Sequence, residues 1–228
     1  MNKTKIDWAT HTWNPVTGCL GPNNDGATCP YCYAARIATR FAGSAAFPNG
    51  FKPTFHEERL RDPDLQRIPA GSRVFVGSMT DLGAPWAGGY LPRILGAAET
   101  RPDVAFLFLT KQPHGFKGVR WPRNCWRGMT ATSGNAAYPF ADMISEEASG
   151  IAFYSLEPLL GQIDGLFVGW ADWVIIGAQT GPGAVAPKRE WIAGILAQVD
   201  SAKRNIPVFM KSSLRPHWDG EWRQEYPK

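Results

Sequence analysis

Three of the four cysteines in the chain lie within fourteen residues, at Cys19, Cys29 and Cys32. The last two form a Cys-x-x-Cys pair, a spacing that lets both sulfurs reach one metal centre, and thiolates are the soft ligands that iron–sulfur clusters and zinc prefer. A structural zinc site is closed by four ligands, but the histidines nearest in sequence, His11 and His56, lie outside this segment. Three cysteines suit a cubane cluster with one iron left open, which predicts a catalytic site.

The cysteine segment lies between the first predicted strand and the first predicted helix. Seven short apolar or aromatic runs are expected to be strands: Thr12–Val16, Arg73–Val76, Val104–Leu109, Cys125–Thr130, Ile151–Ser155, Trp173–Ile176 and Ile206–Met210. Because most of these runs are continuous rather than alternating, they are typical of strands buried on both faces of a parallel sheet. Helical patterns stand between several of them, at Tyr33–Phe41, Leu91–Thr100 and Glu190–Lys203.

This alternation of strands and helices predicts right-handed βαβ units in an α/β fold. We expect a partial (β/α) barrel of about six or seven parallel strands, with an open doubly wound sheet as the alternative. No linker divides the chain, so residues 1–228 are expected to form a single domain with its cluster loop at residues 18–33.

The composition, with 44% hydrophobic and 19% charged residues, is typical of a globular protein. No apolar run approaches the roughly 18 residues of a membrane helix, and no signal peptide follows the N-terminal lysines. We therefore expect a cytoplasmic protein without a membrane partner. The net charge of +4 permits a polyanionic partner. The ten tryptophans suit base stacking, although core packing would account for most of them.

Polar residues follow the predicted strands at the points where the strands end. Thr132, Thr180 and Ser212 are among them, and the candidate site residues are Ser78, Thr80, Asp81, Thr110, Lys111, Thr130, Glu157, Gln179 and Lys211. In parallel α/β sheets, chemistry gathers at the carboxyl ends of the strands. Buried Asp, Glu and Lys side chains are costly without partners or ligands, so the series predicts a polar pocket. Solvated loop starts and helix caps are the alternative for individual members.

The cysteine segment resembles the radical S-adenosylmethionine superfamily, whose signature is three cysteines after the first barrel strand, with an aromatic residue before the last cysteine. Cys29-Pro30-Tyr31-Cys32 matches the second half of that signature. The first spacing differs, because nine residues separate Cys19 from Cys29 where the usual motif has three.

A closer likeness, to a phage-associated branch of unassigned activity, covers nearly the whole chain. Its landmarks are Asp7-Trp8, Thr12-Trp13-Asn14-Pro15-Val16-Thr17-Gly18-Cys19, Cys32-Tyr33-Ala34, Ser78-Met79-Thr80-Asp81-Leu82, Leu109-Thr110-Lys111-Gln112-Pro113, Ser155-Leu156-Glu157-Pro158-Leu159-Leu160-Gly161 and Trp173-Val174-Ile175-Ile176-Gly177. For a phage-encoded member, the compartment would be the cytoplasm of the host cell.

The resemblance implies a [4Fe–4S] cluster on Cys19, Cys29 and Cys32, and bound S-adenosylmethionine as the source of a 5′-deoxyadenosyl radical. An external electron donor of the flavodoxin or ferredoxin type would be a partner. By position, Ser78, Thr80 and Asp81 would face the methionine amino group, Lys111 or Lys211 its carboxylate, Thr130 or Glu157 the ribose, and the backbone of Gly177 to Gln179 the adenine, with Tyr31 and Thr110 beside them. The superfamily's glycine-glycine-glutamate motif is absent from the second strand, so these assignments follow from topology.

Cys125 lies in an apolar, strand-like segment, which is the usual setting of a buried thiol that acts as a small hydrophobe. The alternative is a hydrogen-atom donor to a product radical. This alternative makes Cys125 a candidate catalytic residue beside Lys111 and Glu157.

The substrate is predicted from a basic and aromatic segment that contains Lys117, Arg120, Trp121, Arg123, Trp126 and Arg127. Such a surface suits phosphates and bases. We expect a DNA or nucleotide substrate, namely a modified pyrimidine base of phage DNA that an isomerase or related enzyme rearranges. A small metabolite and a DNA repair role are alternatives, and a non-catalytic, zinc-stabilised nucleic-acid-binding module is the alternative outside enzymes. The sequence leaves open the oligomeric state and whether S-adenosylmethionine is consumed.

Overall fold

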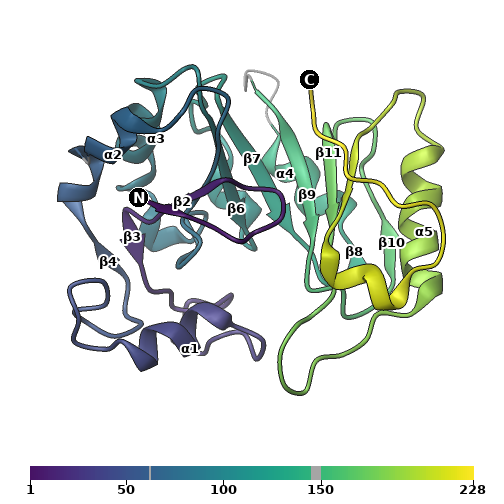
Figure 1. The fold of residues 1–228 in the computed structure, drawn as a ribbon, viewed down its shortest axis with the longest axis horizontal. Helices are drawn as coiled ribbons and strands as arrows, with labels where there is room; N and C mark the ends of the chain where they lie inside the picture. The colour runs from purple at the N-terminus through teal and green to yellow at the C-terminus, as the bar shows by residue number, and fades with distance from the viewer. Residues whose placement is uncertain (62, 145–149) are drawn as a thin grey trace.

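The computed structural model describes residues 1–61, 63–144 and 150–228. Its main element is an eight-stranded sheet in the order β1-β2-β5-β6-β7-β9-β11-β12 (Figure 1). The strands are β1 (Asn2–Lys3), β2 (His11–Trp13), β5 (Arg73–Val76), β6 (Ala105–Thr110), β7 (Cys125–Thr130), β9 (Ala152–Leu156), β11 (Trp173–Ile176) and β12 (Val208–Met210). Neighbouring strands from β2 to β12 are parallel, and β1 is antiparallel to β2.

Two small sheets and a set of short helices surround the main sheet. One small sheet pairs β3 (Val16–Thr17) with β4 (Thr54–Phe55), and the other pairs β8 (Gly134–Asn135) with β10 (Ile163–Gly165). The α-helices are α1 (Tyr33–Arg40), α2 (Pro63–Arg67), α3 (Leu91–Glu99), α4 (Ala137–Met143) and α5 (Arg189–Asp200). The 3-10 helices are η1 (Glu57–Arg61), η2 (Pro85–Ala87), η3 (Pro113–Phe116) and η4 (Ser212–His217). Among the described residues, no helix is both long and apolar enough to cross a bilayer.

Six of the seven predicted strands correspond to one strand each, whereas Thr12–Val16 spans the end of β2 and the start of β3, which belong to different sheets. The three predicted helices correspond to α1, α3 and α5. The predicted partial (β/α) barrel of about six or seven parallel strands is nevertheless wrong. The sheet has eight strands with an antiparallel edge, and helices are few. Only η3 lies between β6 and β7, because Pro113, Gly115, Gly118 and Pro122 interrupt that crossover. The fold is a mixed α/β fold built on a mostly parallel sheet.

Apolar layers cover both faces of the sheet, because alternate residues of a strand point to opposite faces. Phe106 and Phe108 of β6 belong to the layer that packs against α3 and α5, which Figure 1 shows at opposite flanks of the sheet. Leu107, between them, belongs to the other layer, with Trp173 and with Trp8 from the N-terminal segment. Burial on both faces explains why the strands are apolar without alternation.

The parallel strands bring their carboxyl ends to one edge of the sheet. Trp13 pairs with Val76, and Val76 pairs with Phe108, so β2, β5 and β6 run in step. Figure 1 shows α1, which follows the cysteine loop, below this edge. The loops after the strands and the cysteine loop therefore lie together.

Candidate functional site

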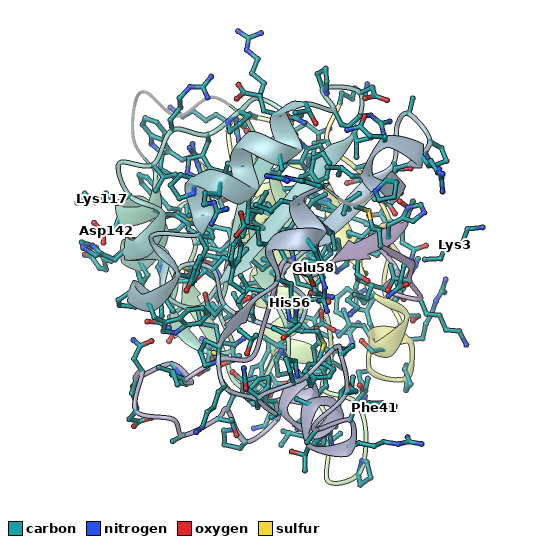
Figure 2. The ribbon with its side chains drawn as sticks, turned by 90° about the vertical axis from the view of Figure 1, so that its left-hand side faces the viewer. Lys3, Phe41, His56, Glu58, Lys117 and Asp142 are labelled. Carbon is teal, nitrogen blue, oxygen red and sulfur yellow. The ribbon has the colours of Figure 1, made fainter. Side chains whose placement is uncertain are left out.

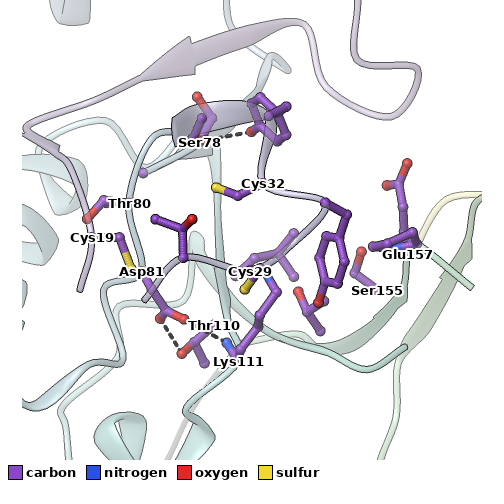
Figure 3. Close-up of a pocket in the computed structure, with 18 of the residues that line it drawn as sticks. Cys19, Cys29, Cys32, Ser78, Thr80, Asp81, Thr110, Lys111, Ser155 and Glu157 are labelled. Carbon is purple, nitrogen blue, oxygen red and sulfur yellow. Dashed lines mark hydrogen bonds between the residues drawn. The ribbon is translucent and has the colours of Figure 1, made fainter. Parts of the chain in front are cut away.

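A cavity of about 400 Å³ lies at the carboxyl edge of the sheet, and this volume is within the range of small-molecule sites. We call it the cysteine pocket. Its wall contains Cys19, Cys29, Tyr31, Cys32, Ser78, Thr80, Asp81, Thr110, Lys111, Thr130, Glu157, Gln179 and Lys211, all of them predicted site residues. Figure 3 shows the three cysteines apart from Ser155 and Glu157, which lie at the other side of the view.

The backbone before the first cysteine is fixed by close contacts. Gly18 has φ +88°, and a Cβ atom there would lie 2.3 Å from the carbonyl oxygen of Lys52, so the position requires glycine. The Thr80 hydroxyl donates a hydrogen bond of 2.7 Å to the Gly18 carbonyl. The Cys19 amide donates to the Phe51 carbonyl at 3.0 Å. Cys19 is thus positioned by the loops after β5 and before β4.

Asn14 holds the loop that follows β5. Its Oδ1 accepts hydrogen bonds from the Ser78 hydroxyl and the Met79 amide, each 3.1 Å long. The Tyr33 hydroxyl donates to the Ser78 carbonyl, as the dashed line in Figure 3 shows. The hydroxyl hydrogens of Ser78 and Thr80 are therefore used within the protein, at Asn14 and at the Gly18 carbonyl, and the Ser78 carbonyl holds α1 through Tyr33.

Two of the thiols accept backbone hydrogen bonds. The Cys19 sulfur accepts from the Gly21 amide at 3.2 Å, and the Cys32 sulfur, at the N-cap of α1, accepts from the Ala35 amide at 3.3 Å. Burial raises the pKa of Cys19 to about 11, although the Gly21 amide and Lys111 act in the opposite direction. Metal ligands must be deprotonated, so binding of a metal centre by Cys19 would release its proton.

The three thiols are all half-buried in one cavity. Among the described residues, no group of three or more His, Cys, Asp or Glu side chains is arranged to hold a single metal ion. In a cubane cluster each thiolate binds a different iron, so its ligands stand farther apart than those of one ion. The donor set therefore fits a cluster by its chemistry: three partly buried thiols, two of them with amide donors.

Within the described residues, Cys125, His56 and His11 do not supply a fourth zinc ligand beside the three cysteines. Cys125 is fully buried at the start of β7. At roughly 3.3 Å per residue, the strand places Cys125 about 17 Å from Thr130 at the carboxyl edge of the sheet. The Nε2 atom of His56 lies 2.8 Å from the hydroxyl oxygen of Thr17, and His56 is only 5% exposed. His11 is in β2, and its Nδ1 contacts the hydroxyl of Thr10 at 2.9 Å.

Asp81 joins the ends of two neighbouring strands. Its Oδ1 accepts hydrogen bonds from the Thr110 hydroxyl at 2.5 Å and the Gly83 amide at 3.1 Å, and its Oδ2 accepts from the Lys111 amide at 2.9 Å. The side chain is buried. Asp81 is thus committed to positioning Lys111, and Thr110 shares that role.

The two lysines of the pocket differ in their partners. The Lys211 ammonium donates to the Glu157 carboxylate. The Lys111 ammonium lies 5.9 Å from the centre of the Tyr31 ring and makes no ion pair within the described part of the chain. Burial, with the neighbouring Cys29, raises the pKa of Tyr31 to about 12, so the phenol is neutral. Lys111 is therefore available to an anionic ligand in the pocket.

Two hydroxyl groups face the pocket from adjacent strands. Thr130 of β7 and Ser155 of β9 are paired in register, and both line the cavity. Within the described residues, neither hydroxyl makes a hydrogen bond, so both are free to bind a ligand. Ser155 was not among the predicted site residues, although it is the last residue of a predicted strand, as Thr130 is.

Gly177 and Cys125 are the predicted site residues that lie outside the wall of the pocket. A Cβ atom on Gly177 would be 2.8 Å from the Glu157 carboxyl carbon, so the glycine leaves room for that side chain. Gln179 lines the pocket, but its amide oxygen accepts a hydrogen bond from the Val185 amide at 2.9 Å.

Thr180, which was expected at a strand end, also lines the cavity. Other lining residues were not predicted, namely Tyr33, Arg36 and the apolar pair Trp8 and Phe75. Tyr33 directly follows Cys32, and Trp8 belongs to the Asp7-Trp8 landmark, so both had a signal in the sequence. Arg36 had no signal in the sequence other than its place on the predicted helix.

The basic segment predicted to bind nucleic acid is largely neutralised. Lys117 pairs with Asp142 at 2.8 Å, and Arg120 pairs with Glu99 at 2.7 Å. Figure 2 shows the Lys117–Asp142 pair at one side of the molecule. Trp121 is buried, as is Arg127. This segment therefore offers less free positive charge than its sequence indicated.

The chain was also compared with known proteins. No curated protein and no solved structure matches it significantly. A family model matches residues 3–226, which is nearly the whole chain. The chain therefore belongs to the family described as protein of unknown function (DUF5131).

Proposed function

We propose that this chain is a radical S-adenosylmethionine enzyme that holds a [4Fe–4S] cluster on Cys19, Cys29 and Cys32. The observation that carries the proposal is that three half-buried thiols and a lysine that makes no ion pair with any described residue line one cavity at the carboxyl edge of a mostly parallel sheet. When bound, the cluster and S-adenosylmethionine supply a 5′-deoxyadenosyl radical for hydrogen abstraction. The electron would come from an external donor of the flavodoxin or ferredoxin type.

The residues of the pocket have separate tasks in this proposal. Lys111, held by Asp81, pairs with the carboxylate of the methionine part, and the hydroxyls of Thr130 and Ser155 bind the ribose. Apolar side chains of the wall, among them Trp8 and Phe75, exclude water from the radical chemistry.

Glu157 and Lys211 form a hydrogen-bonded pair away from the cysteines, and this pair can hold or move a proton at the Glu157 carboxylate. We assign it to the substrate side of the cavity. The proposed reaction is the rearrangement, or another modification, of a pyrimidine base in DNA. Because reduced thiols and an iron–sulfur centre require a reducing compartment, we place the enzyme in the cytoplasm.

The proposal is tested by cofactor cleavage. The protein is reconstituted without oxygen, reduced with dithionite and mixed with S-adenosylmethionine. Wild type should release 5′-deoxyadenosine and methionine, Cys32→Ala should release neither, and Cys125→Ala should behave as wild type because Cys125 lies outside the pocket. A fully loaded wild type that cleaves no cofactor would defeat the proposal.

A further inference from the structure

Helix α1 and its C-cap Phe41 turn an apolar and basic face to solvent. Tyr33, Ile37 and Phe41 are 46%, 38% and 49% exposed. Arg36 and Arg40 stand between them and are exposed too. The spacing i, i+3, i+4, i+7, i+8 puts all five side chains on one side of the helix, and we call them the α1 face.

Apart from the hydrogen bond of the Tyr33 hydroxyl to the Ser78 carbonyl, the contacts that attach α1 to the protein come from its opposite side. Ala34 and Ala38, on the opposite side, pack against Phe47 and Met79. Small residues thus make the internal contacts, while three large apolar side chains stay outside over little more than two turns. A contiguous exposed apolar patch of this kind is typical of a binding surface.

The surroundings of the α1 face are positively charged. Residues 26–56 contain no Asp or Glu, and they include Arg36, Arg40 and Lys52. In the described part of the chain, neither arginine of the face pairs with a carboxylate. The Arg40 guanidinium lies 5.4 Å from the centre of the Phe41 ring. Unpaired positive charge beside aromatic rings favours a polyanionic partner.

The α1 face is continuous with the cysteine pocket. Tyr33 and Arg36 line the cavity as well as the outer face. A Cβ atom on Gly181 would lie 3.8 Å from the Arg36 guanidinium, so the loop after β11 comes close to α1 at this point. A ligand on the α1 face therefore reaches the pocket directly.

We propose that the α1 face binds a strand of single-stranded nucleic acid and leads one base into the cysteine pocket, where its modification rests on the proposed function. Bases would stack on Tyr33 and Phe41, and phosphates would pair with Arg36 and Arg40. Stacking on exposed rings accommodates any base, so this surface supplies affinity and leaves the choice of base to the pocket.

The size of the face favours nucleic acid over an acidic protein. The eight residues of α1 extend about 12 Å at roughly 1.5 Å per residue. A stable protein partner buries about 800 Å² on each side, which far exceeds this two-turn stripe. A few nucleotides match its length. Figure 2 shows Phe41 far from the Lys117–Asp142 pair, so this surface is separate from the neutralised segment.

The experiment measures binding of a short, fluorescent oligodeoxythymidine to the reconstituted protein by anisotropy. The double variant Arg36→Glu/Arg40→Glu should bind the oligonucleotide at least about tenfold more weakly than wild type. The slope of log affinity against log salt concentration should also become shallower by about 1.4, because each lost phosphate contact on a single strand contributes about 0.7. Phe41→Ala should weaken binding about 5-fold to 100-fold through the loss of one stacked base.

Two matched variants serve as controls. Arg123→Glu reverses an exposed charge at the amino end of β7, and Tyr138→Ala removes an aromatic side chain that is 80% exposed on α4. Both should bind the oligonucleotide as wild type does. Unchanged binding by the α1 variants, or an equal loss in Arg123→Glu, would overturn the inference.

Two further results separate the explanations. If the α1 variants keep oligonucleotide binding but lose reduction by a flavodoxin-type protein, the face binds an acidic protein, and the inference is overturned. Formation of 5′-deoxyadenosine by wild type is scored independently. Its absence, with the pattern of oligonucleotide binding as expected, would defeat the proposed function and leave the binding surface standing.

Discussion

The Asp81 carboxylate accepts a hydrogen bond of 2.5 Å from the Thr110 hydroxyl, and this contact joins the ends of β5 and β6 inside the cysteine pocket. The other carboxylate oxygen accepts from the Lys111 amide, so one buried side chain fixes the backbone of a lysine that lines the pocket. Both oxygens of Asp81 accept hydrogen bonds. In an asparagine at this position, the NH₂ group would face a hydrogen-bond donor of the protein instead of an acceptor.

Asp81→Asn should therefore lower the free energy of unfolding by about 2 to 3 kcal/mol, because a buried hydrogen bond to a charged group is replaced by an unfavourable contact. Urea unfolding monitored by circular dichroism measures the change. Asp164→Asn, at an exposed position of β10, is the matched control and should change stability by less than about 0.5 kcal/mol. Equal effects in the two variants would refute the structural role of Asp81.

The two pocket lysines should differ in their effect on cofactor affinity. Lys111→Met removes a pocket cation that has no ion-pair partner within the described residues and should weaken S-adenosylmethionine binding about tenfold or more, with the iron content unchanged. Lys211→Met should weaken binding less, because that ammonium is already held by Glu157. Isothermal titration calorimetry on the reconstituted protein compares them, and the reverse order would contradict the assignment.

Asp7 should make stability depend on pH. Partial burial acts to raise its pKa, but hydrogen bonds from Ser212 and the charge of Lys211 outweigh this effect and hold the pKa below its usual value. A carboxylate with a lowered pKa in the folded state stabilises the fold above the pKa of the unfolded chain, about 3.9, and this contribution is lost as the pH falls through the folded-state pKa. Asp7→Asn should therefore cost up to about 1 kcal/mol at neutral pH, since solvent screens a partly exposed group.

Thermal unfolding of wild type and Asp7→Asn between about pH 7 and pH 2.5 tests this dependence. The difference between the two proteins should be constant at neutral pH and shrink below about pH 4. A difference that stays the same down to the lowest pH would show that the charge of Asp7 is not what stabilises the contact with Ser212.

Cys125 should be inert in the folded protein. It is fully buried, and burial raises its pKa, so its thiolate is scarce and inaccessible. Iodoacetamide at pH 8, followed by mass spectrometry, should leave Cys125 unmodified in the folded apoprotein and label it after unfolding in urea. Labelling of the folded protein at Cys125 as fast as at the half-buried Cys32 would contradict its place in the core.

The strands could be predicted because a strand buried on both faces is apolar along its whole length, as Ala105–Thr110 and Trp173–Ile176 are. Whether the sheet closes into a barrel could not be predicted from these apolar runs. The edge strand Asn2–Lys3 has no apolar pattern, and its antiparallel pairing depends on contacts with His11 and Thr12 that only the folded chain brings together. Helices are few because glycines and prolines interrupt the connections between strands, and the apolar pattern of the strands carries no information about these connections.

Residues of the candidate site could be placed near one another because parallel strands end at the same edge of the sheet. Their individual roles depended on hydrogen bonds that no spacing reveals. Asp81, Ser78 and Thr80 bind other protein groups, and Gly177 makes room for Glu157. The exposed face of α1 could not be predicted either, because the sequence does not show that the buried residues of this helix are Ala34 and Ala38.

The central claim is that Cys19, Cys29 and Cys32 hold one cubane cluster. Iron and acid-labile sulfide should be counted after anaerobic reconstitution of wild type and of Cys19→Ala, Cys29→Ala and Cys32→Ala. We predict a brown wild type with about four irons and four sulfides per chain, and colourless single variants with little of either. One zinc per chain, no colour and no sulfide in wild type would contradict the account.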